Sequence, residues 1–150
     1  MAKRPDLMEL ALDEARAAAA RGEVPIGAVL SVNGAVIARA GNRTRELNDP
    51  TAHAEMLVLS EGSRLLAAER LLEADLHVTL EPCTMCAAAI SLARIRRLYF
   101  GAADEKGGGV VSGVRFYASP TCHHAPDVYG GLAETESAEL LRAFFRERRL

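Results

Sequence analysis

The 150-residue sequence contains no tryptophan, few aromatic residues and no long apolar run. A transmembrane helix needs about 20 mostly apolar residues, so the absence of such a run excludes a membrane-spanning segment. Acidic residues at Asp6, Glu9 and Asp13 interrupt the N-terminal stretch, so it lacks the apolar core of a secretory signal peptide. We therefore expect a cytoplasmic protein.

The charge balance is nearly even, with 18 basic and 20 acidic residues and a net charge of −2. This balance argues against a protein that binds nucleic acid over its whole surface, but it leaves room for a local basic patch. Hydrophobic residues make up 49% of the chain, which excludes disorder as its main state. The length and the absence of a linker or repeat predict a single domain over residues 1–150.

Cysteine is scarce, because the chain has only three, an odd number for structural disulfides. Two of them, Cys83 and Cys86, have CxxC spacing. In a reducing compartment this spacing favours metal or redox chemistry over a disulfide framework.

Apolar periodicity and turn residues divide the chain into alternating helices and strands. Two β-rich runs flank Asn33-Gly34, which indicates a type I′ hairpin. We expect helices over 7–20, 51–68, 81–93 and 133–148, and strands over 26–32, 35–38, 76–80, 95–100 and 127–129.

This order of elements predicts an α/β fold with a mixed sheet of mostly five strands. The hairpin supplies one antiparallel pair, and the strand–helix–strand alternation after it requires parallel crossovers. Helices should cover both faces of the sheet, which gives a three-layer α/β/α sandwich.

Two short motifs carry the chemistry, His53-Ala-Glu55 and Pro82-Cys83-x-x-Cys86, each at the expected start of a helix. Helix N-termini lower thiol pKa values and favour thiolates. One imidazole and two thiolates form a donor set that suits Zn²⁺. The two motifs together therefore predict one zinc ion per chain, held by His53, Cys83 and Cys86.

The number of ligands indicates a catalytic zinc site, because structural zinc normally takes four protein ligands. The fourth position would hold a water, and Glu55 is placed to act as its general acid and base. One geometric difficulty is that residues two apart on a regular helix point about 200° apart. In the first turn, side chains lean toward the helix start, so both His53 and Glu55 can still reach one site.

Each motif alone has other interpretations, since a lone CxxC also occurs in redox pairs and structural zinc sites. A zinc-stabilised RNA-binding module without catalysis would need a fourth ligand, which only Cys122, His123 or His124 could supply. We interpret these three as ordinary loop residues, and His77 as a histidine packed in a strand.

H-x-E followed by P-C-x-x-C is the signature of zinc-dependent nucleobase deaminases. Longer segments are similar to one family in particular, the bacterial tRNA-specific adenosine deaminases. The segments that carry this resemblance are Gly22-Glu-Val-Pro-Ile-Gly-Ala-Val29, Gly41-Asn-Arg43, Asp49-Pro-Thr-Ala-His-Ala-Glu55, Glu81-Pro-Cys-Thr-Met-Cys86 and Arg94-Ile-Arg-Arg-Leu-Tyr-Phe-Gly101.

The resemblance implies a cytidine-deaminase-like fold, a homodimer and hydrolysis of the wobble adenosine of a tRNA anticodon to inosine. It matches Asn42 to a base-contacting asparagine, and Asp104 and Lys106 to a loop that touches the anticodon backbone. It also matches Phe145 and the C-terminal helix to an element that faces the anticodon stem-loop.

Two features stay open. Arg142, Arg146 and Arg149 form a stripe on the last helix that either contacts RNA phosphates or is a solvated face. The triplet Gly107–Gly109 indicates either flexibility or close approach of the backbone to RNA.

A free-base or nucleoside deaminase of the guanine or cytosine type is the main alternative function. Such an enzyme would share the zinc site and Glu55 but would not need the basic helix or the RNA-contacting loops.

Overall fold

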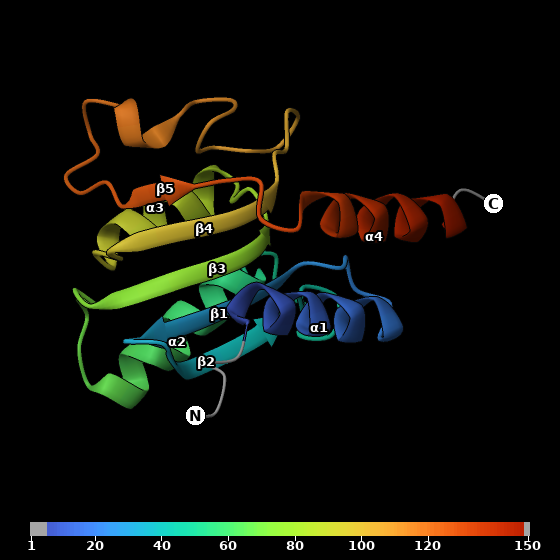
Figure 1. The fold of residues 1–150 in the computed structure, drawn as a ribbon, viewed down its shortest axis with the longest axis horizontal. Helices are drawn as coiled ribbons and strands as arrows, with labels where there is room; N and C mark the ends of the chain where they lie inside the picture. Colours follow the sequence, from blue (N-terminus) through green and yellow to red (C-terminus); the bar gives the residue numbers. More distant parts are fainter. Residues whose placement is uncertain (1–5, 149–150) are drawn as a thin grey trace.

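The computed structural model describes residues 6–148, which form a five-stranded sheet with helices on both faces (Figure 1). The elements in chain order are α1 (Leu7–Ala20), β1 (Gly27–Val32), β2 (Ala35–Gly41), α2 (Ala54–Leu66), β3 (Ala74–Leu80), α3 (Thr84–Leu92), β4 (Arg97–Ala102), the 3-10 helix η1 (Phe116–Ala118), β5 (Asp127–Tyr129) and α4 (Glu134–Glu147). Within residues 6–148, no helix is both long enough and apolar enough to cross a bilayer.

The sheet is mixed, as the sequence predicts, with the strand order β2-β1-β3-β4-β5. Strand β1 lies antiparallel to both β2 and β3, whereas β3, β4 and β5 are parallel to one another. Helix α3 makes the crossover between β3 and β4, so both strands end at the same edge of the sheet. That edge is where the candidate site forms.

The β1–β2 hairpin turns at Asn33 and Gly34, which have φ values of 51° and 80°. Positive φ at both central residues is the requirement of a type I′ turn, and asparagine and glycine tolerate it best. The predicted hairpin is therefore confirmed.

The two faces of the sheet are packed differently. Leu30, Leu76 and Leu98 point toward α2 and α3 and are fully buried in the main core. On the opposite face, Val29 packs against Met8 and Ala11 of α1 in a smaller cluster. The three-layer arrangement is thus held by apolar packing on both faces.

Several expected boundaries are wrong by two or three residues. Arg94 has a φ of 61°, and the Ile95 N–H donates to the Ile90 carbonyl. Ile95 therefore lies in the turn that caps α3, and β4 begins only at Arg97. Strand β3 begins at Ala74 instead of residue 76, because Ala74 pairs with Val32 of β1. The hairpin ladder likewise extends β2 to Gly41.

Candidate metal and active site

The predicted site lies where α2 and α3 begin, beside the carboxyl end of β3. Both helices begin three residues later than expected, at Ala54 and Thr84. His53 and Cys83 are the residues that precede each helix, and both have extended backbones. This geometry removes the difficulty of the 200° separation, because His53 lies before the helix and Glu55 in its first turn.

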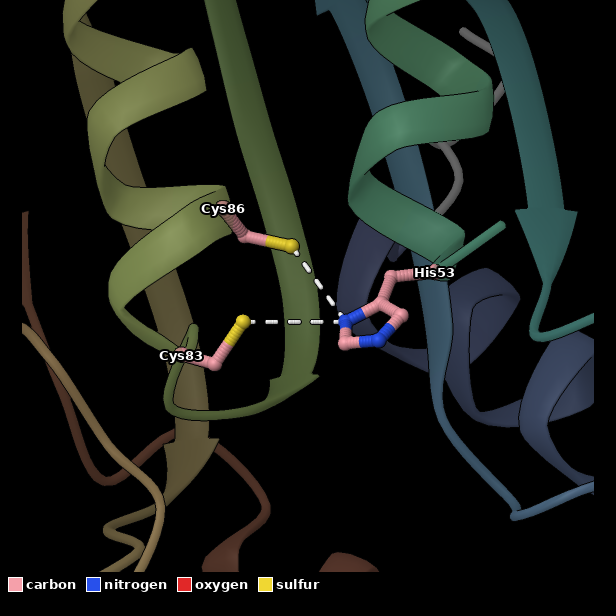
Figure 2. A group of neighbouring side chains, drawn as sticks. All are labelled: His53, Cys83 and Cys86. Atoms are coloured by element: carbon pink, nitrogen blue, oxygen red, sulfur yellow. Dashed lines mark hydrogen bonds between the residues drawn. The ribbon is translucent and has the colours of Figure 1, made fainter. Parts of the chain in front are cut away.

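His53, Cys83 and Cys86 come together as the sequence predicts (Figure 2). The Nδ1 atom of His53 lies 3.6 Å from Cys83 Sγ and 3.5 Å from Cys86 Sγ. Among the residues that the structure describes, these three form the group of ligand-type side chains close enough to hold a metal ion.

The distances among the three side chains fit a zinc ion. Zinc–nitrogen and zinc–sulfur bonds of about 2.0 and 2.3 Å at a tetrahedral angle place N and S about 3.5 Å apart. The separations found here match that value, and Nδ1 faces both sulfur atoms (Figure 2). The site therefore has the composition and the spacing of a three-ligand zinc centre.

The two cysteines differ in their surroundings. Cys86 is fully buried, and its pKa is raised by hydrogen bonding with Cys83 and by burial. The same interaction with Cys86 lowers the pKa of the half-buried Cys83 to about 4, with a further contribution from His53. Cys83 is therefore a thiolate near neutral pH, which is the form that binds metals.

Glu55 points into the same site from the first turn of α2. Its side chain is 3% exposed, and its Oε1 atom is buried without a hydrogen-bond partner among the described residues. Burial raises the pKa of this carboxyl to about 7. A buried polar atom without a partner is rare in folded proteins, and this one, beside the metal group, is placed to bind water or substrate.

Asn42 follows β2 and is buried beside the start of α2. Its Oδ1 accepts a hydrogen bond from the Ala54 N–H at 2.8 Å. The carboxamide oxygen therefore satisfies one of the free N–H groups of the helix, which leaves the NH₂ group available to donate to a substrate.

The loop after β4 places Asp104 and Lys106 at the same edge of the sheet. Lys106 is exposed, whereas the Asp104 carboxylate turns back to accept the N–H groups of Lys106 and Gly107. The glycines that follow do approach a backbone closely, but it is the protein's own. A Cβ on Gly109 would lie 2.7 Å from the Thr84 backbone.

The loop residues Cys122 and His124 stay away from the metal group. The Cys122 thiol donates to the His124 carbonyl, and His124 Nε2 lies 2.8 Å from the Ile95 carbonyl oxygen. These contacts support the interpretation of both as ordinary loop residues. His77 is a packed histidine as expected, stacked on Tyr99 with a ring distance of 4.4 Å.

Helix α4 carries the remaining candidates, and its C-terminal half extends past the end of the sheet (Figure 1). Arg142 and Arg146 are exposed on it, while Arg149 lies outside the described residues. Phe145 is 46% exposed, so it does not belong to the apolar face, which packs through Phe144 instead. Phe145 is therefore free to contact a ligand.

Two buried carboxylates at this edge were not found by sequence reasoning. Glu23 accepts the N–H groups of Arg45 and Glu46, in the loop that follows Asn42. Glu81 accepts bonds from the loop after β4, and these outweigh the effect of burial and lower its pKa. For Glu81, the signal in the sequence was an acidic residue directly after a predicted buried strand and two residues before Cys83.

Residues 1–102 match the family model described as the cytidine and deoxycytidylate deaminase zinc-binding region, and the chain belongs to this family. It is 71% identical to a tRNA-specific adenosine deaminase of Agrobacterium fabrum, over its full length and 99% of that protein. Within the deaminase family, the chain therefore belongs with the tRNA-specific adenosine deaminases.

Solved structures agree with this placement. One, from a study of A-to-I editing by tRNA:A34 deaminases at the wobble position of transfer RNA, is 72% identical with a TM-score of 0.89. It covers 90% of this chain and 98% of its own. A guanine deaminase from Bacillus subtilis is 28% identical with a TM-score of 0.65, covering 96% and 92% of the two chains. The cytidine-deaminase-like fold is thereby confirmed.

Proposed function

We propose that this chain hydrolyses the wobble adenosine of a tRNA anticodon to inosine and releases ammonia. The observation that carries the proposal is the buried Glu55 carboxylate beside a three-ligand zinc group. The similarity to tRNA-specific adenosine deaminases over the full length of the chain supports the choice of substrate.

His53, Cys83 and Cys86 would hold one zinc ion through Nδ1 and the two Sγ atoms. When bound, zinc acts as a Lewis acid that lowers the pKa of a coordinated water to about 7. With three protein ligands, the site keeps one position for that water. Cys122, His123 and His124 are not needed as ligands.

Glu55 would move the protons of the reaction. Its carboxylate accepts a proton from the attacking water and passes it to ring N1 of the adenine. Glu55 would then carry the proton of the hydroxyl added at C6 to the amine, so that the C6–N bond breaks and adenosine and water give inosine and ammonia. Burial suits this role, since it raises the pKa of Glu55 toward neutrality, where a group exchanges protons most effectively.

The RNA would lie across the edge of the sheet where these groups meet. The NH₂ group of Asn42 would donate to the base, while Asp104 and Lys106 would meet the backbone of the anticodon loop. Phe145 would stack on an RNA base near the Arg142–Arg146 side of α4. A base in a stacked loop must be flipped out to reach the zinc group, which costs a few kcal/mol.

The decisive experiment compares substrates for the purified, zinc-loaded chain. An anticodon stem-loop with adenosine at the wobble position is incubated beside free adenosine, guanine and cytidine, and each is scored for its deaminated product. We expect inosine in the stem-loop alone. Deamination of free guanine without inosine in RNA would instead favour the guanine deaminase alternative, which shares this fold.

We further propose that the chain forms a homodimer through the outer surfaces of α2 and α3. A groove of about 510 Å³ runs between them and is lined in part by Met56, Leu59 and Leu92. Leu92 is 74% exposed, and exposed apolar residues beside a groove are typical of protein interfaces.

We also propose that the protein acts in the cytoplasm, because its tRNA substrate is found there and its cysteine ligands must stay reduced.

A further inference from the structure

The carboxylate of Glu81 is a second buried acidic group at the candidate site, and it contacts neither the metal group nor a cation within residues 6–148. It lies at the end of β3, two residues before Cys83, and is 2% exposed. Its hydrogen-bond partners all belong to the loop after β4. The donors are the backbone N–H groups of Asp104, Val110, Val111 and Ser112 and the Ser112 hydroxyl, at 2.9–3.0 Å.

The same loop also packs directly on the turn that carries Cys83. The Gly109 N–H donates to the Pro82 carbonyl, and Gly108 forms an antiparallel bridge with Cys83. A Cβ on Gly108 would lie 2.4 Å from the Glu81 carboxyl carbon, so the loop backbone touches this carboxylate without any intervening side chain. The zinc-ligand turn and the loop are therefore a single packed unit.

We propose that Glu81 is a positioning residue that fixes the loop of residues 104–112 against the zinc-ligand turn and so sets where Asp104 and Lys106 meet the RNA. This inference rests on the proposed function, because it assigns the loop to RNA binding. The loop has little packing of its own, since most of its residues are exposed or glycine and Val110 alone is a buried apolar anchor. Five hydrogen bonds to one charged acceptor are thus a major part of what orders it, beside the backbone contacts with the zinc-ligand turn.

The geometry separates this role from catalysis. Glu81 Oε1 accepts two hydrogen bonds from the loop and Oε2 accepts three. Neither oxygen is therefore left to accept a proton or to bind a base. Substitution of Glu81 should therefore weaken RNA binding while the chemical step, once RNA is bound, proceeds through Glu55 as before.

Glu81→Gln tests the proposal, because it replaces one accepting oxygen by an NH₂ group. This group is itself a donor and cannot accept a hydrogen bond from the loop N–H groups. We expect the Kd and KM for a wobble-adenosine stem-loop to rise about tenfold or more, the size of effect expected for hydrogen bonds to a charged group. We expect kcat at saturating RNA within about threefold of the wild type, with one zinc retained per chain. Hydrogen exchange should become faster at the amides of Val110, Val111 and Ser112.

Glu105→Gln is the matched control, since Glu105 is an exposed acidic residue of the same loop and removing it changes the charge equally. Loss of a negative charge alone would leave RNA affinity unchanged or strengthen it. Ser112→Ala keeps the Glu81 charge but removes one donor, so it should give a smaller effect in the same direction. It also keeps the proposal testable if Glu81→Gln does not fold.

Three outcomes would overturn the inference. Wild-type KM in Glu81→Gln together with fast exchange at the loop amides would show that the loop does not position RNA. Loss of zinc would assign Glu81 to the metal site. A loss of affinity in Glu105→Gln equal to that in Glu81→Gln would show that the effect does not depend on the hydrogen bonds that Glu81 makes. If the wild-type chain itself does not bind the stem-loop, the proposed function fails instead, and the exchange rates still report whether Glu81 orders the loop.

Discussion

The carboxamide of Asn42 illustrates how one side chain can serve folding and substrate binding at once. Its oxygen caps the first N–H of α2, the helix that carries Glu55, and its NH₂ group is left for the substrate. Replacing the whole side chain would therefore disturb two functions, whereas replacing only the NH₂ group would disturb one.

We predict that Asn42→Asp keeps the thermal stability of the wild type but loses about 1–3 kcal/mol of stem-loop binding, because it keeps the cap and loses the donor. Asn42→Ala should lose the same binding energy and, in addition, about 1 kcal/mol of unfolding free energy. Thermal unfolding and deamination at limiting RNA measure the two effects. Wild-type activity in Asn42→Asp at limiting RNA would reduce Asn42 to a capping residue.

For Glu55, we predict that replacement by alanine lowers kcat by at least about 10²–10⁴-fold, the range of general acid–base catalysis, to the point of undetectable turnover. Zinc content and thermal stability should stay close to the wild type, because the carboxylate is not among the grouped metal ligands. Zinc analysis and single-turnover kinetics provide the measurements. If the variant loses zinc, Glu55 is a ligand and not a proton carrier.

At the scale of elements, α4 extends well beyond the end of the sheet (Figure 1). If Arg142 and Arg146 contact phosphates, each should contribute about −0.7 to the slope of log Kobs against log salt for single-stranded RNA. We predict that Arg142→Gln/Arg146→Gln flattens the slope by about 1.4, and by about two once Arg149→Gln is added, with kcat at saturating RNA preserved.

Binding of the stem-loop across a salt series measures this effect, with zinc content as the control. An unchanged slope would assign the arginine stripe to solvent and turn the search toward Lys106, Arg43, Arg45 and Arg94.

The strongest local signals predicted the elements correctly. Asn33-Gly34 fixed the hairpin because its turn depends on only two residues, and His53 and Cys83 were found because their chemistry is coded in short motifs. The ends of the elements depend on contacts between residues far apart in the chain, such as the pairing of Ala74 with Val32. A local sequence pattern does not contain this information. Glu81 was missed for the same reason, since its donors lie more than 20 residues away in the chain.

For the whole molecule, the outer faces of α2 and α3 provide a test of assembly. We predict that Leu92→Glu converts a dimer to a monomer, because it places a charge in the centre of an interface that must be dry. Sedimentation at several protein concentrations measures the change. Val36→Glu is the control that should stay dimeric, because Val36 is an exposed apolar residue of the edge strand β2 and does not line the groove. A Leu92→Glu dimer would rule out this face.

The metal group also joins two distant parts of the chain, because His53 and Cys83 are 30 residues apart and begin different helices. A ligand that binds only the folded chain adds stability by mass action, so each tenfold rise in free zinc above its Kd adds about 1.4 kcal/mol to the unfolding free energy. Zinc thus acts as a reversible cross-link between α2 and α3. The melting temperature of this protein should therefore follow the zinc supply of its surroundings, and chelation should loosen the same edge of the sheet that binds the substrate.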